Sequence, residues 1–126
     1  MIPHQITSAQ HPLVKKFVKL REDKTFREEQ RSAIVLGKKL LDELKPHIKI
    51  KTIISDTAAV QPDILATPEI MKKISGLQSC DGVAFEVEIP LSTPLEGKRL
   101  LALDSLSDPG NLGTLIRSAI SFGFEG

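Results

Sequence analysis

The spacing of apolar and polar positions predicts a helix at the start of the chain. In residues 8–31, apolar side chains recur at helical intervals and form one stripe. Pro12 suits a first helical position, where its missing N–H costs nothing, and Ser8 or His11 can cap the helix before it. We therefore expect one helix over most of this stretch.

Short apolar runs then alternate with helical ones over residues 32–90. Prolines and glycines separate these runs, as they do between regular elements. The pattern predicts strands over residues 32–37, 50–55, 64–66 and 83–89, and helices over residues 38–45 and 67–76. Strands and helices in alternation predict an α/β layer domain.

A segment with two prolines and a glycine, residues 91–99 with the preceding Pro90, predicts a linker. Residues 100–106 then predict a buried strand, and residues 111–122 a helix. The DPGN sequence between them predicts a type II turn with Asn111 as the helix N-cap. One strand and one helix cannot bury both faces of a parallel sheet, so we expect the chain to stop within a second domain.

Composition excludes several classes of protein. The chain has 126 residues, of which 40% are hydrophobic and 26% charged, an ordinary balance for a folded domain. No apolar run approaches the ~20 residues that a membrane-spanning helix needs, and the first residues lack the pattern of a secretory signal. The single cysteine, Cys80, cannot form an internal disulfide. We expect a cytoplasmic protein with no membrane segment.

Charge is distributed unevenly along the chain. Residues 1–51 hold 12 Lys and Arg against 6 Asp and Glu, whereas residues 52–126 hold 5 against 10. A basic N-terminal part indicates local contact with a polyanion, and a solvated helix with paired charges is the alternative. The candidate RNA-binding residues in this part are Lys15, Lys16, Lys19, Arg27 and Arg31.

The predicted helix over residues 111–122 has two distinct faces. Leucine, isoleucine, alanine and phenylalanine occupy one side, and small polar residues occupy the other. Arg117 is its only charged residue, with Thr114 and Ser121 close to it. An arginine among hydroxyl side chains near a helix N-terminus suits a phosphate, and an exposed arginine on an ordinary helix is the alternative.

The segment LALDSLSDPGNLGTLIRSAISFG, residues 101–123, resembles the first motif of the SpoU (TrmH) class of the SPOUT superfamily. Members of this class are RNA ribose 2′-O-methyltransferases. The opening segment ITSAQHPLVKKFVKLREDKTFREEQ and residues 32–88 also resemble members of the class. The resemblance implies an α/β substrate-binding domain akin to RNA-binding ribosomal proteins, followed by the first βα unit of a truncated trefoil-knot (SPOUT) domain.

The same resemblance implies roles for particular residues. Asn111 and Arg117 match the active-site asparagine and arginine of the family. Thr114, a close neighbour of Arg117 on the polar face of the helix, is a further candidate RNA-binding residue. Because a guanidinium is almost never deprotonated, we expect Arg117 to clamp a phosphate and stabilise the developing alkoxide. The family has a glutamate before the glycine that follows its first strand, where this chain has Leu36.

The family motifs that form the pocket for S-adenosylmethionine lie beyond residue 126, so we expect no cofactor-binding residue in this chain. The resemblance also implies a homodimer. Metal ligation is not expected, because His4, His11, His47 and Cys80 lack the spacing of metal ligands.

Together these observations predict four regions. Residues 1–31 form a basic helical segment, 32–90 an RNA substrate-binding domain, 91–99 a linker and 100–126 the start of a methyltransferase domain. The predicted function is ribose 2′-O-methylation of rRNA or tRNA with S-adenosylmethionine, to which this chain contributes RNA recognition and the first catalytic motif. A non-catalytic RNA-binding module, or a remnant without the cofactor site, is the alternative.

Overall fold

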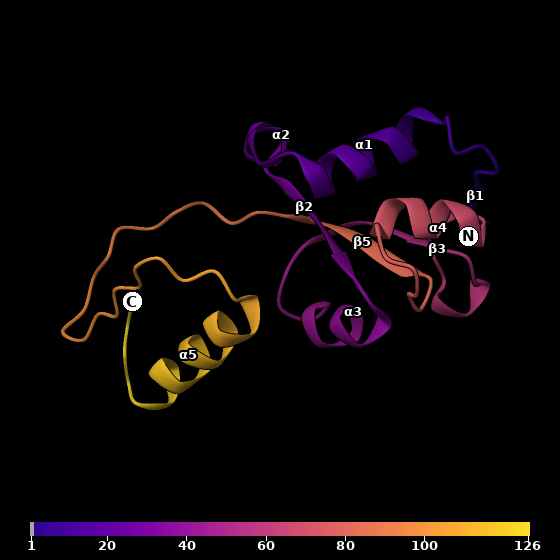
Figure 1. The fold of residues 1–126 in the computed structure, drawn as a ribbon. Coiled ribbons are helices and arrows are strands. Elements are labelled where there is room, and N and C mark those ends of the chain that lie inside the picture. The colour runs from indigo at the N-terminus through magenta and orange to yellow at the C-terminus, as the bar shows by residue number, and fades with distance from the viewer. Residues whose placement is uncertain (1) are drawn as a thin grey trace. The chain divides into compact units, whose positions relative to one another are not determined.

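The computed structural model describes residues 2–126 and has a mixed α/β architecture (Figure 1). The chain divides into two compact units, Met1–Pro90 (unit 1) and Leu91–Gly126 (unit 2). The elements of unit 1 are β1 (His4–Gln5), α1 (Pro12–Glu22), α2 (Lys24–Gln30), β2 (Ser32–Leu36), α3 (Lys38–Leu44), β3 (Ile50–Ser55), the short 3₁₀ helix η1 (Ala58–Val60), β4 (Ile64–Leu65), α4 (Pro68–Ser75) and β5 (Val83–Glu88). Unit 2 contains α5 (Pro109–Ser121).

The five strands of unit 1 form one mixed sheet in the order β1-β4-β3-β5-β2. β5 lies between β3 and β2 and runs antiparallel to both, whereas β4 pairs parallel with β3 and with β1. Every strand predicted in this part of the chain is present, and β1 is an addition that the sequence pattern does not predict. The fold is therefore the expected α/β class.

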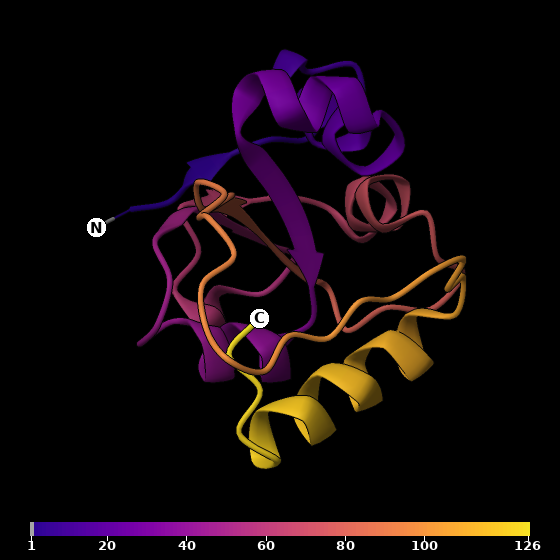
Figure 2. The same cartoon turned by 90° about the vertical axis from the view of Figure 1, so that its left-hand side faces the viewer.

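Helices cover both faces of this sheet (Figure 2). Val14, Phe17 and Leu20 of α1 pack with the apolar side chains of α4 on one face. On the other face, Leu41 of α3 packs against Phe85 of β5. Alternate residues of β5 enter the two cores, as the period of a strand requires.

The helix predicted over residues 8–31 is in fact two helices. α1 begins after His11, whose Nδ1 accepts from Leu13 N, and it ends at Asp23. Asp23 has an extended backbone, and its carboxylate accepts from Phe26 N to start α2. The break follows because an aspartate that caps a new helix cannot also continue the previous one.

Unit 2 differs from its predicted form at two places. The helix begins at Pro109 and is capped by Asp108, whose carboxylate accepts from Gly110 N at 2.8 Å, so neither the type II turn nor Asn111 as N-cap is correct. Residues 100–106 form no strand. A strand needs a hydrogen-bonded neighbour, and the described residues form only two such bonds here, Leu101 N to Gly126 O at 2.6 Å within the segment and Glu125 N to Arg99 O at 2.9 Å just before it.

Those two bonds still connect segments on either side of α5. Residues 99–101 precede the helix and residues 125–126 follow it, and the contact advances in the same direction along both. This is the start of a parallel pairing across a helix, as in a βαβ unit. Of the expected βα unit, the helix is thus present, whereas the strand is not formed.

Candidate functional site

The helix that holds Arg117 starts from a well-formed N-terminus. Asp108 accepts from two backbone N–H groups, Pro109 occupies the first helical position, and Thr114 Oγ1 donates to Gly110 O at 3.0 Å. The Asp108 carboxylate already satisfies the first free N–H groups, as capping side chains do. Thr114 is predicted to contact RNA, but its hydroxyl group donates this hydrogen bond to a carbonyl of its own helix.

Arg117 lies back along α5 over Gly113. A Cβ atom added at Gly113 would lie 3.4 Å from Arg117 Nη1 and 3.7 Å from Nη2. Because Gly113 has no side chain, the guanidinium has room to lie one turn before its own backbone. Ser121 Oγ donates to Arg117 O at 3.0 Å. Within residues 2–126 no carboxylate forms an ion pair with Arg117, so its charge is available to a ligand.

Asn111 and Arg117 lie on the same helix, in unit 2, and both are exposed. The side chain of Asn111 makes no hydrogen bond within the described residues, and its backbone N–H points to Asp108 Oδ1 at 3.4 Å. The structure therefore leaves both predicted catalytic side chains open to solvent. Their arrangement can bind an anion through the guanidinium, with an amide nearby to donate or accept a hydrogen bond.

The predicted basic residues lie on α1 and α2 of unit 1, where the structure gives them different surroundings. Lys15 is exposed, and Lys19 is exposed with Nζ 4.4 Å from the centre of the Phe26 ring, a cation–π distance. Lys16 reaches the sheet, where its Nζ lies 3.2 Å from Oε1 of the buried Glu86. Lys15 and Lys19 thus face outward, and Lys16 is partly committed to the fold.

The two predicted arginines of this set bind backbone carbonyls. Arg27 Nη1 donates to Leu20 O at 2.8 Å and to Arg21 O at 2.9 Å, which satisfies carbonyls at the end of α1. Arg31 Nη2 donates to Ile89 O at 3.1 Å. Sequence periodicity does not reveal these contacts, because they depend on the break at Asp23 and on the pairing of β2 with β5.

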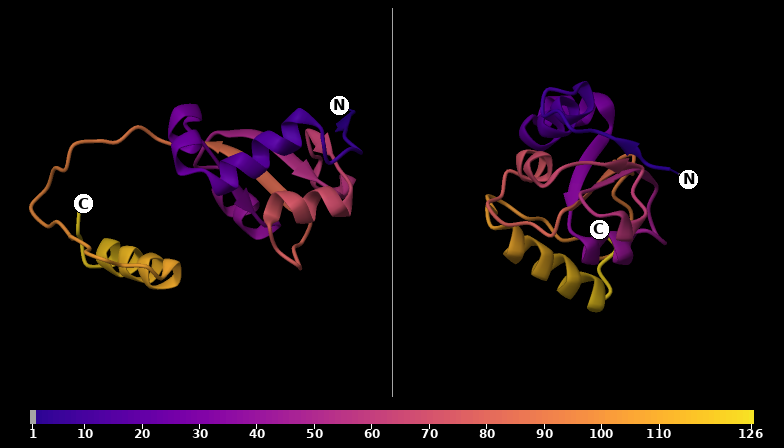
Figure 3. Two further views of the ribbon diagram at one scale, coloured as in Figure 1. Left: turned by 45° about the horizontal axis from the view of Figure 1, so that its top comes forward. Right: turned by 90° about the vertical axis from the view of Figure 1, so that its right-hand side faces the viewer.

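α1 and α4 lie beside one another on one face of the sheet (Figure 3). Arg21 Nε of α1 donates to Ile74 O at 2.9 Å, near the end of α4, and Lys73 Nζ of α4 donates to Ala9 O at 3.4 Å. These contacts fix the helix that presents Lys15 and Lys19. The sequence missed them, since both partners are backbone carbonyls distant in the chain.

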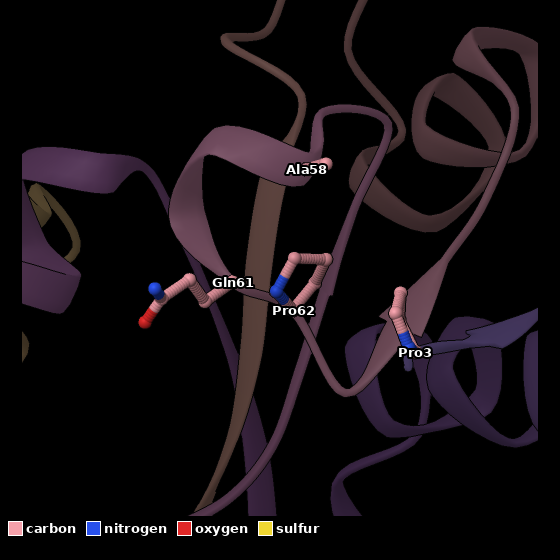
Figure 4. A pocket seen from close by; sticks show the side chains of 4 residues that line it. All are labelled: Pro3, Ala58, Gln61 and Pro62. Atoms are coloured by element: carbon pink, nitrogen blue, oxygen red, sulfur yellow. The ribbon is translucent and has the colours of Figure 1, made fainter. Parts of the chain in front are cut away.

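Two hollows on the surface do not have the chemistry of a catalytic site. In unit 1 a hollow is lined by Pro3, Ala58, Gln61 and Pro62, none of them ionisable (Figure 4). In unit 2 a hollow lies along the apolar side of α5, with one carboxylate, that of Glu125, at its edge. A third hollow, in unit 1, is lined by Lys38, Asp42 and Lys45 among others. None of the three hollows includes Asn111 or Arg117 in its lining.

Neither a membrane-crossing helix nor a cluster of metal ligands was found in the part of the chain that the structure describes. No helix there is long and apolar enough to cross a membrane. No group of three or more His, Cys, Asp or Glu side chains there could hold a metal ion.

Comparison with known proteins places this geometry in a family context. No family model matches the chain. It is 30% identical over 139 aligned residues to an uncharacterized tRNA/rRNA methyltransferase of Synechocystis sp., covering 96% of this chain and 50% of that protein. It is 25% identical to the 23S rRNA (guanosine(2553)-2′-O)-methyltransferase RlmP of Bacillus subtilis, covering 96% of this chain and 52% of that protein.

Solved structures agree with these relatives. The AdoMet-bound rRNA methyltransferase from Sinorhizobium meliloti superposes with a TM-score of 0.72 at 33% identity, covering 97% of this chain and 52% of that one. In sequence and in fold, the chain is thus a relative of SpoU/TrmH-type RNA methyltransferases. It spans about half the length of the curated relatives it matches.

Proposed function

We propose that this chain supplies RNA recognition and the first catalytic segment of an S-adenosylmethionine-dependent RNA ribose 2′-O-methyltransferase that acts on rRNA or tRNA. The observation that supports the proposal most directly is Arg117, an exposed guanidinium without an ion-pair partner among residues 2–126, on the helix that Asp108 caps. The names of the related methyltransferases support it independently.

Arg117 acts here as an electrostatic clamp. Methyl transfer would form an O–C bond to the 2′-oxygen as the S–C bond of the methyl donor breaks, and the hydroxyl proton would pass to water. Negative charge develops on the oxygen as that proton leaves. A guanidinium stabilises that charge and can hold a neighbouring phosphate with two parallel hydrogen bonds, but it does not take up the proton itself. Asn111, with a free side-chain amide, orients the ribose or the phosphate beside Arg117. Thr114 lies on the same helix, close to the bound RNA.

S-adenosylmethionine is the cofactor that the related methyltransferases imply. The residues described here do not fit it. The hollow beside α5 is lined by Leu101, Leu103, Ile116 and other apolar side chains, and it offers no set of donors for the adenine, ribose and amino-acid groups of the cofactor. We therefore derive no catalytic step through the cofactor from these residues.

The basic residues of unit 1 hold the RNA. Lys15 and Lys19 present exposed charges to phosphates, and Lys16, Arg27 and Arg31 add to the positive potential of α1 and α2 while they stabilise the fold. We further propose that the whole protein is a cytoplasmic homodimer. Residues 32–90 recognise the RNA in this proposal, and the catalytic part begins at residue 100.

A non-catalytic RNA-binding module is the second candidate. One observation favours it, namely that the hollow beside α5 is lined almost entirely by apolar side chains. The two candidates differ in one activity, the transfer of a methyl group to RNA.

The test is methyl transfer by the protein isolated from its native cells. Its intact mass is measured first, and transfer of labelled methyl groups from S-adenosylmethionine to rRNA and tRNA is then measured for the wild type and for Arg117→Ala. We expect wild-type transfer and a loss of about 10²–10³-fold in the variant with its fold intact. RNA binding without any methyl transfer would favour the module, and near-normal turnover of the variant would contradict the role of Arg117.

A further inference from the structure

A second group of cations gathers at one end of the sheet of unit 1. β2 begins at Ser32, β3 begins at Ile50, and β5 ends at Glu88. Because β5 runs antiparallel between the other two strands, its last residues lie beside their first ones, with Ser32 opposite Glu88 and Ile50 opposite Val87. The residues that precede or open β2 and β3 therefore meet at this end.

Three of those residues are basic: Arg31, Lys49 and Lys51, here called the sheet-end cluster. The backbone fixes two of them, since Ile89 N donates to Arg31 O at 2.8 Å and Glu88 N donates to Lys49 O at 3.4 Å. In the sequence, β2, α3 and a turn separate Arg31 from the lysines. Only the strand pairing brings them together.

The side chains of the cluster are held close to the sheet and remain exposed. Arg31 has a left-handed backbone, with φ of 50°, and its guanidinium donates to Ile89 O. The pairing of β3 with β5 shifts in register between Ile50 and Thr52. Lys51 lies at that irregularity, and its ammonium group donates to Ser32 Oγ on β2. Such a bulge redirects a side chain, and here it brings the Lys51 ammonium across β5 to β2.

The charge balance of this end is positive. Lys49 Nζ lies 3.4 Å from Glu88 Oε2, and its side chain is 75% exposed. Glu86, the next carboxylate along the same face of β5, is buried and paired with Lys16. Three exposed cations therefore face one partly exposed carboxylate, and that excess charge attracts a polyanion.

We propose that the sheet-end cluster binds the phosphate backbone of the RNA substrate, as a contact additional to the basic face of α1. This inference rests on the proposed RNA-binding function. A guanidinium and two ammonium groups that the fold holds near one another can neutralise successive phosphates with little loss of side-chain freedom. Ile89, whose carbonyl binds Arg31, lies just before the boundary of unit 1, so the contact is made where the chain leaves this unit.

The test is the salt dependence of binding to a fluorescently labelled RNA stem-loop, measured by anisotropy with this chain. The variant combines Arg31→Asn, Lys49→Gln and Lys51→Gln. Asparagine tolerates the left-handed backbone at position 31, and glutamine keeps a donor for Ser32. The control removes three exposed lysines elsewhere, through Lys39→Gln, Lys45→Gln and Lys72→Gln.

Affinity falls as salt concentration rises, and each phosphate contact makes the plot of log affinity against log salt concentration steeper by about 0.9. This value is that of B-form DNA, and we apply it to duplex RNA. We expect the cluster variant to lose about two to three units of slope and the control less than one. If the triple variant does not fold, as judged by circular dichroism, Lys49→Gln alone is expected to lose about one unit.

The outcomes separate this inference from the proposed function. Wild-type binding that falls steeply with salt, together with an unchanged slope in the cluster variant, would overturn the inference and the contribution of Arg31 to RNA binding, and would leave the rest of the proposed function standing. Wild-type affinity that is absent or insensitive to salt would overturn both.

Discussion

Lys16 of α1 lies over the centre of the sheet, with its Nζ 3.2 Å from Oε1 of Glu86 on β5. The two partners are unequal, because the Glu86 side chain is only 4% exposed and the Lys16 side chain is 35% exposed. Within residues 2–126 that carboxylate oxygen accepts no hydrogen bond, and Lys16 Nζ donates instead to the other oxygen, Oε2, at 3.5 Å. The lysine can turn to solvent if its partner is removed, whereas the glutamate cannot.

Removal of the lysine and removal of the glutamate should therefore have different effects on stability. We expect Lys16→Met to lower the free energy of unfolding by about 1–3 kcal/mol, since it leaves a buried carboxylate unpaired. Glu86→Leu should be close to neutral or stabilising, because it replaces the buried charge with an apolar group. Urea unfolding measures both, with Lys15→Met as a control that should stay within about 0.5 kcal/mol. An equal loss of unfolding free energy in the two single variants would show that Lys16 does not stabilise the Glu86 carboxylate.

Gly113→Ala tests whether the position of Arg117 depends on the glycine beneath it. Alanine in a helix is usually more stable than glycine by about 0.5–1 kcal/mol, so the helix should not weaken. Its Cβ would lie 3.4 Å from Arg117 Nη1, at the short end of ordinary van der Waals contact, so the guanidinium would shift by a few tenths of an ångström at most. In the methyl-transfer assay we expect turnover to fall by about two- to three-fold without loss of stability. Ser118→Ala, on the same helix, is the matched control, and full activity of Gly113→Ala would refute the dependence.

The start of α5 offers a direct contrast between the expected and the observed cap. Asp108→Ala should destabilise the helix by about 0.5–2 kcal/mol, because two backbone N–H groups lose their acceptor. Asn111→Ala should cost far less, since the side chain of Asn111 makes no hydrogen bond within the described residues. Hydrogen exchange at the Gly110 and Asn111 amides distinguishes the two, and greater exchange in Asn111→Ala than in Asp108→Ala would reverse the assignment.

S-adenosylmethionine should not bind to residues 1–126 alone. The hollow beside α5 is apolar and lacks the donors that the cofactor requires. Isothermal titration calorimetry of this chain with the cofactor should give no saturable heat, whereas the AdoMet-bound Sinorhizobium meliloti rRNA methyltransferase provides a positive control. Saturable binding at micromolar concentrations would show that the pocket includes residues described here.

Much of the fold could be predicted from the sequence, because local patterns determine most of its elements. The β-branched run of residues 50–55 and the Thr67–Gly76 caps of α4 give β3 and α4 almost to the residue. What failed depended on partners. Residues 100–106 have the composition of a buried strand, but a strand forms only against a neighbour, and β1 exists only because β4 lies beside it.

The candidate site was predicted less completely, for a similar reason. Arg117 and Asn111 belong to a contiguous motif, so their place on one helix follows from the sequence. The contacts of Arg27 with Leu20 and of Lys16 with Glu86 join distant parts of the chain, and no local pattern announces them. Lys49 and Lys51 were not among the predicted RNA-binding residues, because their proximity to Arg31 arises from strand order.

The central position of β5 has a consequence for how unit 1 folds during synthesis. β5 lies between β2 and β3 in the sheet and is the last of the five strands to leave the ribosome. Neither β2 nor β3 can complete its hydrogen bonds until Glu88 has emerged. Until then the core beneath α1 lacks Ala84 of β5, and the exposed edges of β2 and β3 are open to wrong partners. Contacts so distant in the chain also make folding slow. A nascent chain halted before residue 83 should therefore remain a substrate for chaperones, with its basic helix already exposed.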